Sequence, residues 1–106
     1  MTVSVEDLQS GGIPESFVLN QNYPNPFNPS TIISYGLPRS GFVTLKVYNI
    51  LGQEIRTLVN GPQNAGRYTV RFDASSLATG FYLYRIHVVP ESGAEFSFVK
   101  KMVLVK

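Results

Sequence analysis

The chain contains no cysteine and only one histidine. Without cysteine it can form neither a disulfide framework nor a thiolate metal site, so packing alone must stabilise the fold. The single histidine, His87, has no second imidazole to share a metal ion or a nucleophile, and the strand pattern around it places it on an outward face. These absences weigh against triad chemistry and against cysteine-based metal binding.

Acidic residues are few and scattered, as Glu6, Asp7, Glu15, Glu54, Asp73, Glu91 and Glu95. None of them has the alternating spacing of a calcium loop, and no glycine run resembles a phosphate cradle. No pattern suggests the paired carboxylates of a glycoside hydrolase. The sequence therefore predicts no catalytic residues, no metal ligands and no cofactor, and an enzyme is the least supported class.

Long hydrophobic runs are also missing, so no segment reaches the length that a membrane-spanning helix requires. The 106 residues are 43% hydrophobic and 15% charged, which is an ordinary balance for one globular domain. Residues 1–12 lack the pattern of a signal peptide and end in Gln-Ser-Gly-Gly, which is typical of a flexible joint. We expect a flexible linker or tail over 1–12 and one domain over 13–106. The net charge of +2 is too small to indicate a nucleic-acid surface.

Residues 20–31 read Asn-Gln-Asn-Tyr-Pro-Asn-Pro-Phe-Asn-Pro-Ser-Thr, and this stretch is the most distinctive part of the chain. Its prolines cannot donate to a sheet ladder, and each keeps the preceding residue out of the helical region. Asparagine side chains readily fold back onto nearby backbone groups, which predicts a stiff, self-bonded loop. Tyr23 and Phe27 are its expected anchors, closing one end of the fold.

The remaining chain alternates between apolar and polar residues with the period of strands. Residues 13–20 suit a short first strand, and segments 31–37 and 42–49 are expected to pair as a hairpin across the turn at 38–41. The inward residues of this hairpin are expected to be Ile33, Tyr35, Leu37, Val43, Leu45 and Val47. A short strand over 54–59 is expected to break at Asn60-Gly61-Pro62.

The cleanest alternation is in residues 67–72, with Tyr68, Val70 and Phe72 inward and Arg67, Thr69 and Arg71 outward. Residues 73–80 form a crossover, which includes one helical turn if Asp73 acts as a cap. Strands over 81–89 and 94–106 follow. In the last strand Lys100 has the parity of the inward residues, so either its stem snorkels or a bulge near Val99 resets the phase.

Seven strands with regular turn signals predict an all-β fold, an immunoglobulin-like antiparallel β-sandwich. Tyr82 lies two residues before the position at which an immunoglobulin domain has its second cysteine, which matches a tyrosine corner. The alternative is that Tyr82 is an ordinary inward strand residue. Tyr84 would take the place of the disulfide by packing.

Residues 17–38 closely resemble the opening of the C-terminal sorting domains of the type IX secretion system (Por secretion system), type A, of Bacteroidetes and their relatives. The resemblance continues through 47–52, 65–66, 72–74 and 77–85, and it ends at Lys-Lys-Met-Val-Leu-Val-Lys over 100–106. The residues that form its structural motif are Asn22, Tyr23, Pro24, Asn25, Pro26, Phe27, Asn28, Pro29, Gly52, Gly80, Tyr82 and Tyr84.

The resemblance implies a non-catalytic secretion signal at the end of a larger, exported cargo protein. It also implies transit through the periplasm, recognition by an outer-membrane translocon, and a final position at the cell surface or outside the cell. In relatives, a sortase-like peptidase often removes the domain. The fold that the family implies is the immunoglobulin-like sandwich that the strand pattern predicts.

The last strand is the candidate sorting signal, comprising Lys100, Lys101, Met102, Val103, Leu104, Val105 and Lys106. If it lies at a sheet edge, its unpaired N–H and C=O groups over 101–106 offer pairing to a partner. The same free edge could bind a second copy, so a structural module that self-associates or spaces domains is one alternative. A carbohydrate-binding module using Tyr23, Phe27, Phe42 or Phe81 is another.

Overall fold

The computed structural model describes residues 12–106, so all of the predicted linker except the exposed Gly12 lies outside the described part of the chain. The strands are β1 (Val18–Leu19), β2 (Ser30–Leu37), β3 (Gly41–Asn49), β4 (Glu54–Gln63), β5 (Gly66–Asp73), β6 (Gly80–Pro90) and β7 (Phe96–Leu104). Over residues 12–106 the structure holds no helix, and thus none that could span a membrane.

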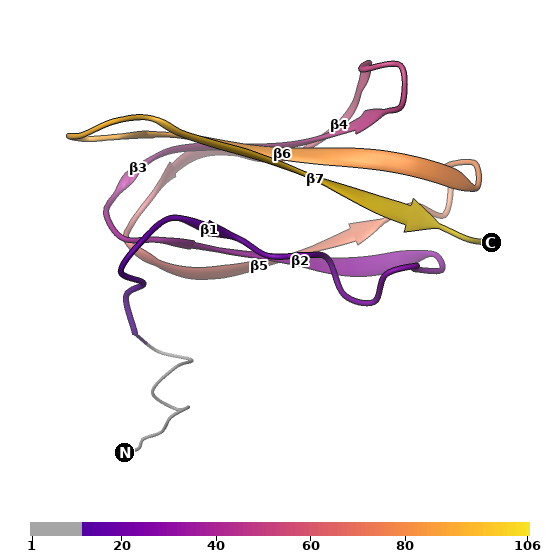
Figure 1. Ribbon diagram of the computed structural model, residues 1–106, viewed down its shortest axis with the longest axis horizontal. Coiled ribbons are helices and arrows are strands. Elements are labelled where there is room, and N and C mark those ends of the chain that lie inside the picture. Colours follow the sequence, from indigo (N-terminus) through magenta and orange to yellow (C-terminus); the bar gives the residue numbers. More distant parts are fainter. Residues whose placement is uncertain (1–11) are drawn as a thin grey trace.

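The strands form two antiparallel sheets that face each other (Figure 1). One sheet has three strands in the order β1-β2-β5, and the other has four in the order β4-β3-β6-β7. This arrangement confirms the predicted antiparallel sandwich. β4 pairs with β3 at one edge of the larger sheet. It does not pair with β5, the next strand along the chain, which belongs to the smaller sheet.

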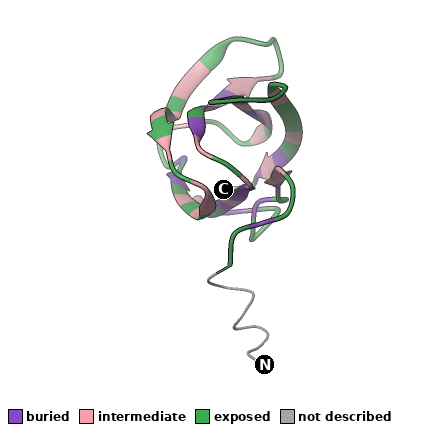
Figure 2. Ribbon diagram, turned by 90° about the vertical axis from the view of Figure 1, so that its left-hand side faces the viewer, coloured by how far each residue is buried: buried purple, intermediate pink, exposed green. Residues whose placement is uncertain are grey.

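The core lies between the sheets, where alternate residues of β2, β3 and β6 are buried (Figure 2). The predicted inward residues of β2 and β3 are all buried, at 2% exposure or less. In β5, Phe72 is buried and Tyr68 and Val70 pack against the core, whereas Arg67, Thr69 and Arg71 are exposed. The period of two in the sequence therefore identified the inward faces correctly.

The expected hairpin of segments 31–37 and 42–49 is wrong, because β2 and β3 belong to different sheets. β2 pairs with β5, and β3 pairs with β4 and β6. Alternation shows which side of a strand is apolar but not which strand lies next to it. Pro38, which has no N–H to close a tight turn, begins the short segment that carries the chain from one sheet to the other.

The fourth strand does not break at Asn60-Gly61-Pro62, as the sequence predicted, but continues to Gln63. Pro62 lies opposite Phe42 in β3. β4 is the outermost strand, and an edge strand tolerates a proline because one of its sides has no ladder of hydrogen bonds. Its register with β3 shifts at two places, which shows that the edge is irregular.

The tyrosine corner is present, since the Tyr82 hydroxyl donates to the carbonyl of Ala78 over 2.6 Å. In the crossover, Asp73 accepts a hydrogen bond from the N–H of Ser75 (2.9 Å), which lowers the pKa of the Asp73 carboxyl, but the segment forms a turn and no helix. The β6–β7 register runs without a shift, so no bulge lies near Val99. The Lys100 stem is half-buried and its Nζ lies 5.0 Å from the centre of the Phe98 ring, so the snorkelling alternative is correct.

Candidate functional site

The proline loop, residues 20–31, is held in shape by the side chain of Asn22. This side chain is 2% exposed, and its amide donates to the Pro24 carbonyl and to the Thr31 hydroxyl, over 3.1 Å in each case. The Thr31 hydroxyl in turn donates to the Pro24 carbonyl over 2.9 Å. These bonds confirm the predicted self-bonded loop, in which asparagine satisfies backbone groups that the prolines leave without sheet partners.

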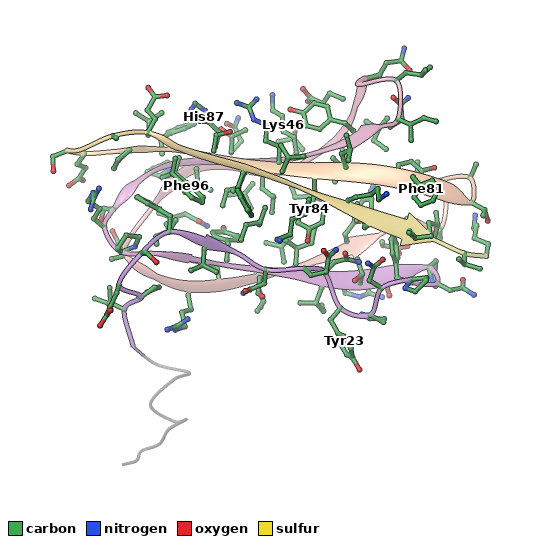
Figure 3. The ribbon with its side chains drawn as sticks, in the orientation of Figure 1. Tyr23, Lys46, Phe81, Tyr84, His87 and Phe96 are labelled. Carbon is green, nitrogen blue, oxygen red and sulfur yellow. The ribbon has the colours of Figure 1, made fainter. Side chains whose placement is uncertain are left out.

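Tyr84 of β6 connects this loop to the four-stranded sheet. Its ring is fully buried between the layers (Figure 3), as expected of a residue that packs where a disulfide would lie. Its hydroxyl donates to the carbonyl of Asn20 (2.7 Å) and accepts from the N–H of Asn22 (2.8 Å). Burial is the main cause that raises the pKa of the Tyr84 phenol to about 12, against the lowering effect of the hydrogen bond from Asn22.

The two aromatic residues of the loop behave differently. Phe27 is 1% exposed and packs near Phe72, with ring centres 6.1 Å apart, so it closes the end of the core as predicted. Tyr23 is 79% exposed and points away from the sandwich (Figure 3), so its predicted role as an anchor is wrong. The backbone of Tyr23 pairs with Ile32 instead, through two hydrogen bonds of 3.0 Å. This bridge uses the backbone and leaves the side chain free.

The loop also covers the outer edge of the last strand. The Phe27 N–H donates to the Val103 carbonyl (2.9 Å), and the Val105 N–H donates to the Phe27 carbonyl (3.0 Å). Two side chains add to this contact: Asn25 Oδ1 accepts from the Val103 N–H (3.0 Å), and Gln21 Nε2 donates to the Lys101 carbonyl (2.8 Å). The loop and the end of the chain therefore form one hydrogen-bonded unit.

This covering corrects the prediction of a free edge at 101–106. β7 is an edge strand, as expected, but the Lys101 carbonyl, both backbone groups of Val103 and the Val105 N–H already have partners in the loop. The backbone N–H of Lys106 donates to Thr79 Oγ1 (3.1 Å), and its Nζ donates to the carbonyls of Ser75 (2.7 Å) and Leu77 (2.8 Å). Most of the outward backbone groups at this end are thus already bonded, so a partner does not meet a continuous free edge over 101–106.

The side chains of the candidate signal residues differ in how far they are buried. Met102 and Leu104 are fully buried, and Lys100 and Val103 are half-buried. Lys101, Val105 and Lys106 are exposed, and the Lys101 Nζ lies 4.9 Å from the centre of the exposed Phe81 ring on the outer face of the larger sheet. Side chains, and not backbone groups, are what this strand presents to solvent.

The other motif residues have structural positions. Pro24, Asn25, Pro26 and Asn28 are exposed on the loop, and the Pro29 carbonyl accepts from the Ala74 N–H over 2.9 Å. Gly80 is the first residue of β6 and lies opposite Leu104. Gly52 has φ of 83°, a conformation that other residues rarely adopt, and it completes a turn in which Asn49 Oδ1 accepts from the N–H groups of Leu51 and Gln53.

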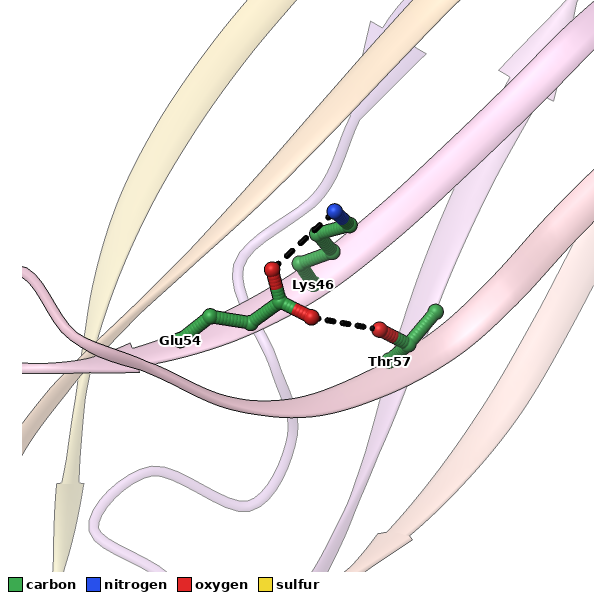
Figure 4. A network of polar contacts seen from close by, with 3 residues as sticks. All are labelled: Lys46, Glu54 and Thr57. Carbon is green, nitrogen blue, oxygen red and sulfur yellow. Dashed lines mark hydrogen bonds and ion pairs between the residues drawn. The ribbon is translucent and has the colours of Figure 1, made fainter.

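Polar clusters elsewhere are small. Glu54 accepts from Lys46 (3.0 Å) and from Thr57 (2.9 Å), as Figure 4 shows, and these hydrogen bonds lower the pKa of its carboxyl. His87 pairs with Glu95 over 2.9 Å on the outward face predicted for it. No group of three or more potential metal ligands occurs within residues 12–106. The first cluster has three residues and the second has two, and the side chains of both ion pairs are about a third or more exposed to solvent.

The sequence did not reveal the roles of Gln21 and Asn25, which bond to residues far along the chain. The one sequence feature that pointed towards these contacts was the burial expected for Phe27. A buried ring fixes the path of the neighbouring backbone, and therefore the positions of nearby loop residues. Which strand that backbone would meet depends on the packing of the whole sandwich, which the loop sequence does not contain.

Comparison with known proteins assigns the family. The model of the secretion system C-terminal sorting domain matches residues 21–105. The chain belongs to this family. It is a type IX secretion system C-terminal sorting domain, a non-catalytic secretion signal for cargo proteins, and the protein is therefore a secreted one. Among curated proteins, none matches the sequence significantly.

Two solved structures share the fold of this sorting domain. Dimeric latent PorU from Porphyromonas gingivalis aligns with a TM-score of 0.63 and 20% identity, over 84% of this chain and 9% of that one. CopC from Methylosinus trichosporium OB3b aligns with a TM-score of 0.53 and 14% identity, over 84% of this chain and 93% of that one. The sorting domain thus spans about a tenth of the length of the PorU chain, and both likenesses concern the β-sandwich alone.

Proposed function

We propose that the folded sorting domain delivers its cargo to an outer-membrane translocon by presenting the surface at which the proline loop meets the end of β7. The supporting observation is the pair of backbone hydrogen bonds from Phe27 to Val103 and Val105. Through them, the motif that is most distinctive of the family and the candidate sorting signal become one rigid surface. A translocon that reads this surface would accept the folded domain and reject an unfolded one.

Side chains are the means of recognition in this proposal, because the loop already occupies the backbone edge at 101–105. Lys101 supplies an exposed cation, and Val105, at 46% exposure, supplies an apolar contact beside the loop. An apolar contact with a neighbouring charge is a common form of specific protein recognition.

In the same proposal, residues 1–12 link the domain to the cargo, and the domain proper comprises residues 13–106. The protein passes through the periplasm and reaches the cell surface or the medium. A sortase-like peptidase would cut within the linker, upstream of the compact region that begins near the buried Pro14.

A secretion assay tests the recognition surface. The chain is fused to the C-terminus of a periplasmic carrier in a type IX-competent bacterium, and the carrier is measured in the periplasm and outside the cell. Lys101→Glu and Val105→Asp are each expected to lower secretion by about tenfold or more. Ile50→Asp, a change at a 70% exposed residue of the β3–β4 turn, is the matched control and is expected to secrete normally.

Point variants are preferable to deletion of 101–106, because that deletion removes the buried Met102 and Leu104 and would unfold the domain. Circular dichroism of each isolated variant shows whether it remains folded. Normal secretion by both folded variants would refute the proposed surface but not the role of the domain as a secretion signal.

A further inference from the structure

The first half of β7 has an open and regular backbone edge. The outward groups of Lys101, Val103 and Val105 point away from β6, and the alternation of a strand gives Ser97 and Val99 the same direction. No register shift interrupts this part of the β6–β7 pair. Within residues 12–106, no other strand pairs with this edge, and the Val99 side chain is 50% exposed.

The other edges are less suited to pairing. β4 contains Pro62 and two register shifts, which interrupt a ladder. β1 has two residues only. β5 is regular, but pairing two copies around Thr69 would bring Arg67 of one copy opposite Arg71 of the other, and like charges directly opposite are destabilising. The first half of β7 is therefore the edge of this domain with the fewest obstacles to strand addition.

We propose that two copies of the chain associate through this edge, with β7 antiparallel to β7 and a two-fold axis at Phe98. Ser97 of each copy then lies opposite Val99 of the other, and their outward N–H and C=O groups form four backbone hydrogen bonds. The result is a continuous sheet across the two copies. A register centred on Val99 is blocked, because it would require the Lys101 carbonyl, which already accepts from Gln21.

An apolar groove beside this edge supplies the contact between side chains. The groove, of about 240 Å³, lies where β1 meets β7 and is lined by Phe17, Val18, Leu19, Phe96 and Phe98. Phe98 is 46% exposed and has the inward parity of β7, so the two-fold axis places both Phe98 rings over their respective grooves. Residues opposite one another without mutual hydrogen bonds have the shortest side-chain separation, which suits an aromatic pair.

Charges on the outer face agree with the same register. When Ser97 lies opposite Val99, Glu95 lies opposite Lys101, and the two-fold symmetry makes this pair occur twice. Both residues are exposed and are on the same face of the sheet, because Glu95 contacts His87 and Lys101 contacts Phe81, both of which point outward. A shift by two residues in either direction removes this match, so the charges favour one alignment.

Exchange of these charges tests the proposal. Sedimentation equilibrium of the whole 106-residue chain is measured from about 10 µM to about 1 mM, at low and high salt. Glu95→Lys and Lys101→Glu each replace two attractive pairs by two repulsive ones, and each is expected to weaken self-association by about tenfold. An equimolar mixture of the two variants restores opposite charges at both positions and is expected to associate at least as strongly as the wild type.

The double variant Ile50→Glu/Leu51→Glu is the control for net charge, since it lowers the net charge as much as Lys101→Glu does, but in the exposed turn between β3 and β4. It is expected to associate like the wild type. A wild-type chain that stays monomeric throughout the concentration range would overturn the proposal. Association that the mixture does not restore, or that occurs without slower amide exchange at Ser97 and Val99, would show that the copies meet at another surface.

Discussion

In its second half, β7 is bordered by the proline loop, whereas no strand within residues 12–106 pairs with the outer edge of its first half. The pairing of the strand with β6 does not explain this difference, since it runs through both halves without a register shift. The loop explains it, because its path ends the exposure of the edge at Lys101. A segment outside the sheet therefore decides which part of an edge strand is protected from pairing.

The largest effect is expected from removing the buried Phe27 ring, which holds the loop against the second half of β7. Phe27→Ala is expected to lower the free energy of unfolding by about 3–5 kcal/mol, because it leaves a cavity at the end of the core. The melting temperature should fall by more than about 10 °C. Tyr23→Ala in the same loop is the control, and at 79% exposure it should change stability by less than about 0.5 kcal/mol. Equal losses in the two variants would contradict the roles assigned to these residues.

A smaller effect is expected from Tyr84→Phe, which keeps the ring but leaves the Asn20 carbonyl and the Asn22 N–H without their partner. We expect a loss of about 1–3 kcal/mol in urea unfolding, with the fold retained. Faster amide exchange at Asn22 would show that the loss arises at the loop. A stability equal to that of the wild type would mean that water replaces the hydroxyl.

Tyr84 also predicts how stability depends on pH. Its pKa in the folded state is raised to about 12, above the ordinary value of a tyrosine, so the fold disfavours the ionised phenol. The stability that the neutral phenol contributes is present below about pH 10 and is lost as the pH rises towards 12. The pKa of Tyr35 is also raised to about 12, mainly by burial, and acts in the same window. Tyr84→Phe should therefore lose less stability than the wild type over this range, as urea unfolding in alkaline buffers would measure.

The smallest effect is expected from a change that exposes one amide in the second half of β7 and leaves the first half as it is. Asn25→Ala removes the acceptor for the Val103 N–H and should cost about 0.5–1.5 kcal/mol. Hydrogen exchange read by NMR should become faster at Val103 and stay unchanged at Val99. In the wild type, Val103 and Val105 should exchange more slowly than Ser97 and Val99 in dilute solution. Similar exchange in both halves of the strand would contradict the protective role of the loop.

Much of the sandwich could be predicted from local pattern. The inward residues of β2, β3 and β5 follow from the period of two, and the position of Tyr82 indicated the tyrosine corner that forms. These features depend on residues that are close in sequence. Alternation did not indicate that the chain changes sheets after Pro38, because both candidate partners of β2 have the same apolar pattern.

The candidate site was predictable only in part, for a physical reason. The burial of Phe27 follows from its size and from its position among prolines, but the exposure of Tyr23 depends on the direction in which the loop leaves β2. The contact between Asn25 and Val103 joins residues 78 positions apart. No local propensity encodes such a contact, and it arises only when both sheets have packed.

The bonds from Phe27 to Val103 and Val105 also have a consequence for the order in which the protein is made. Synthesis completes the proline loop well before the residues that hold it, so a nascent chain that ends before Phe96 lacks both a core strand and the partners of the loop. The domain can become compact only after its final strand has emerged. The sorting domain can therefore fold only after β7 has been translated. A product that terminates before β7 cannot form the surface that we propose the translocon recognises.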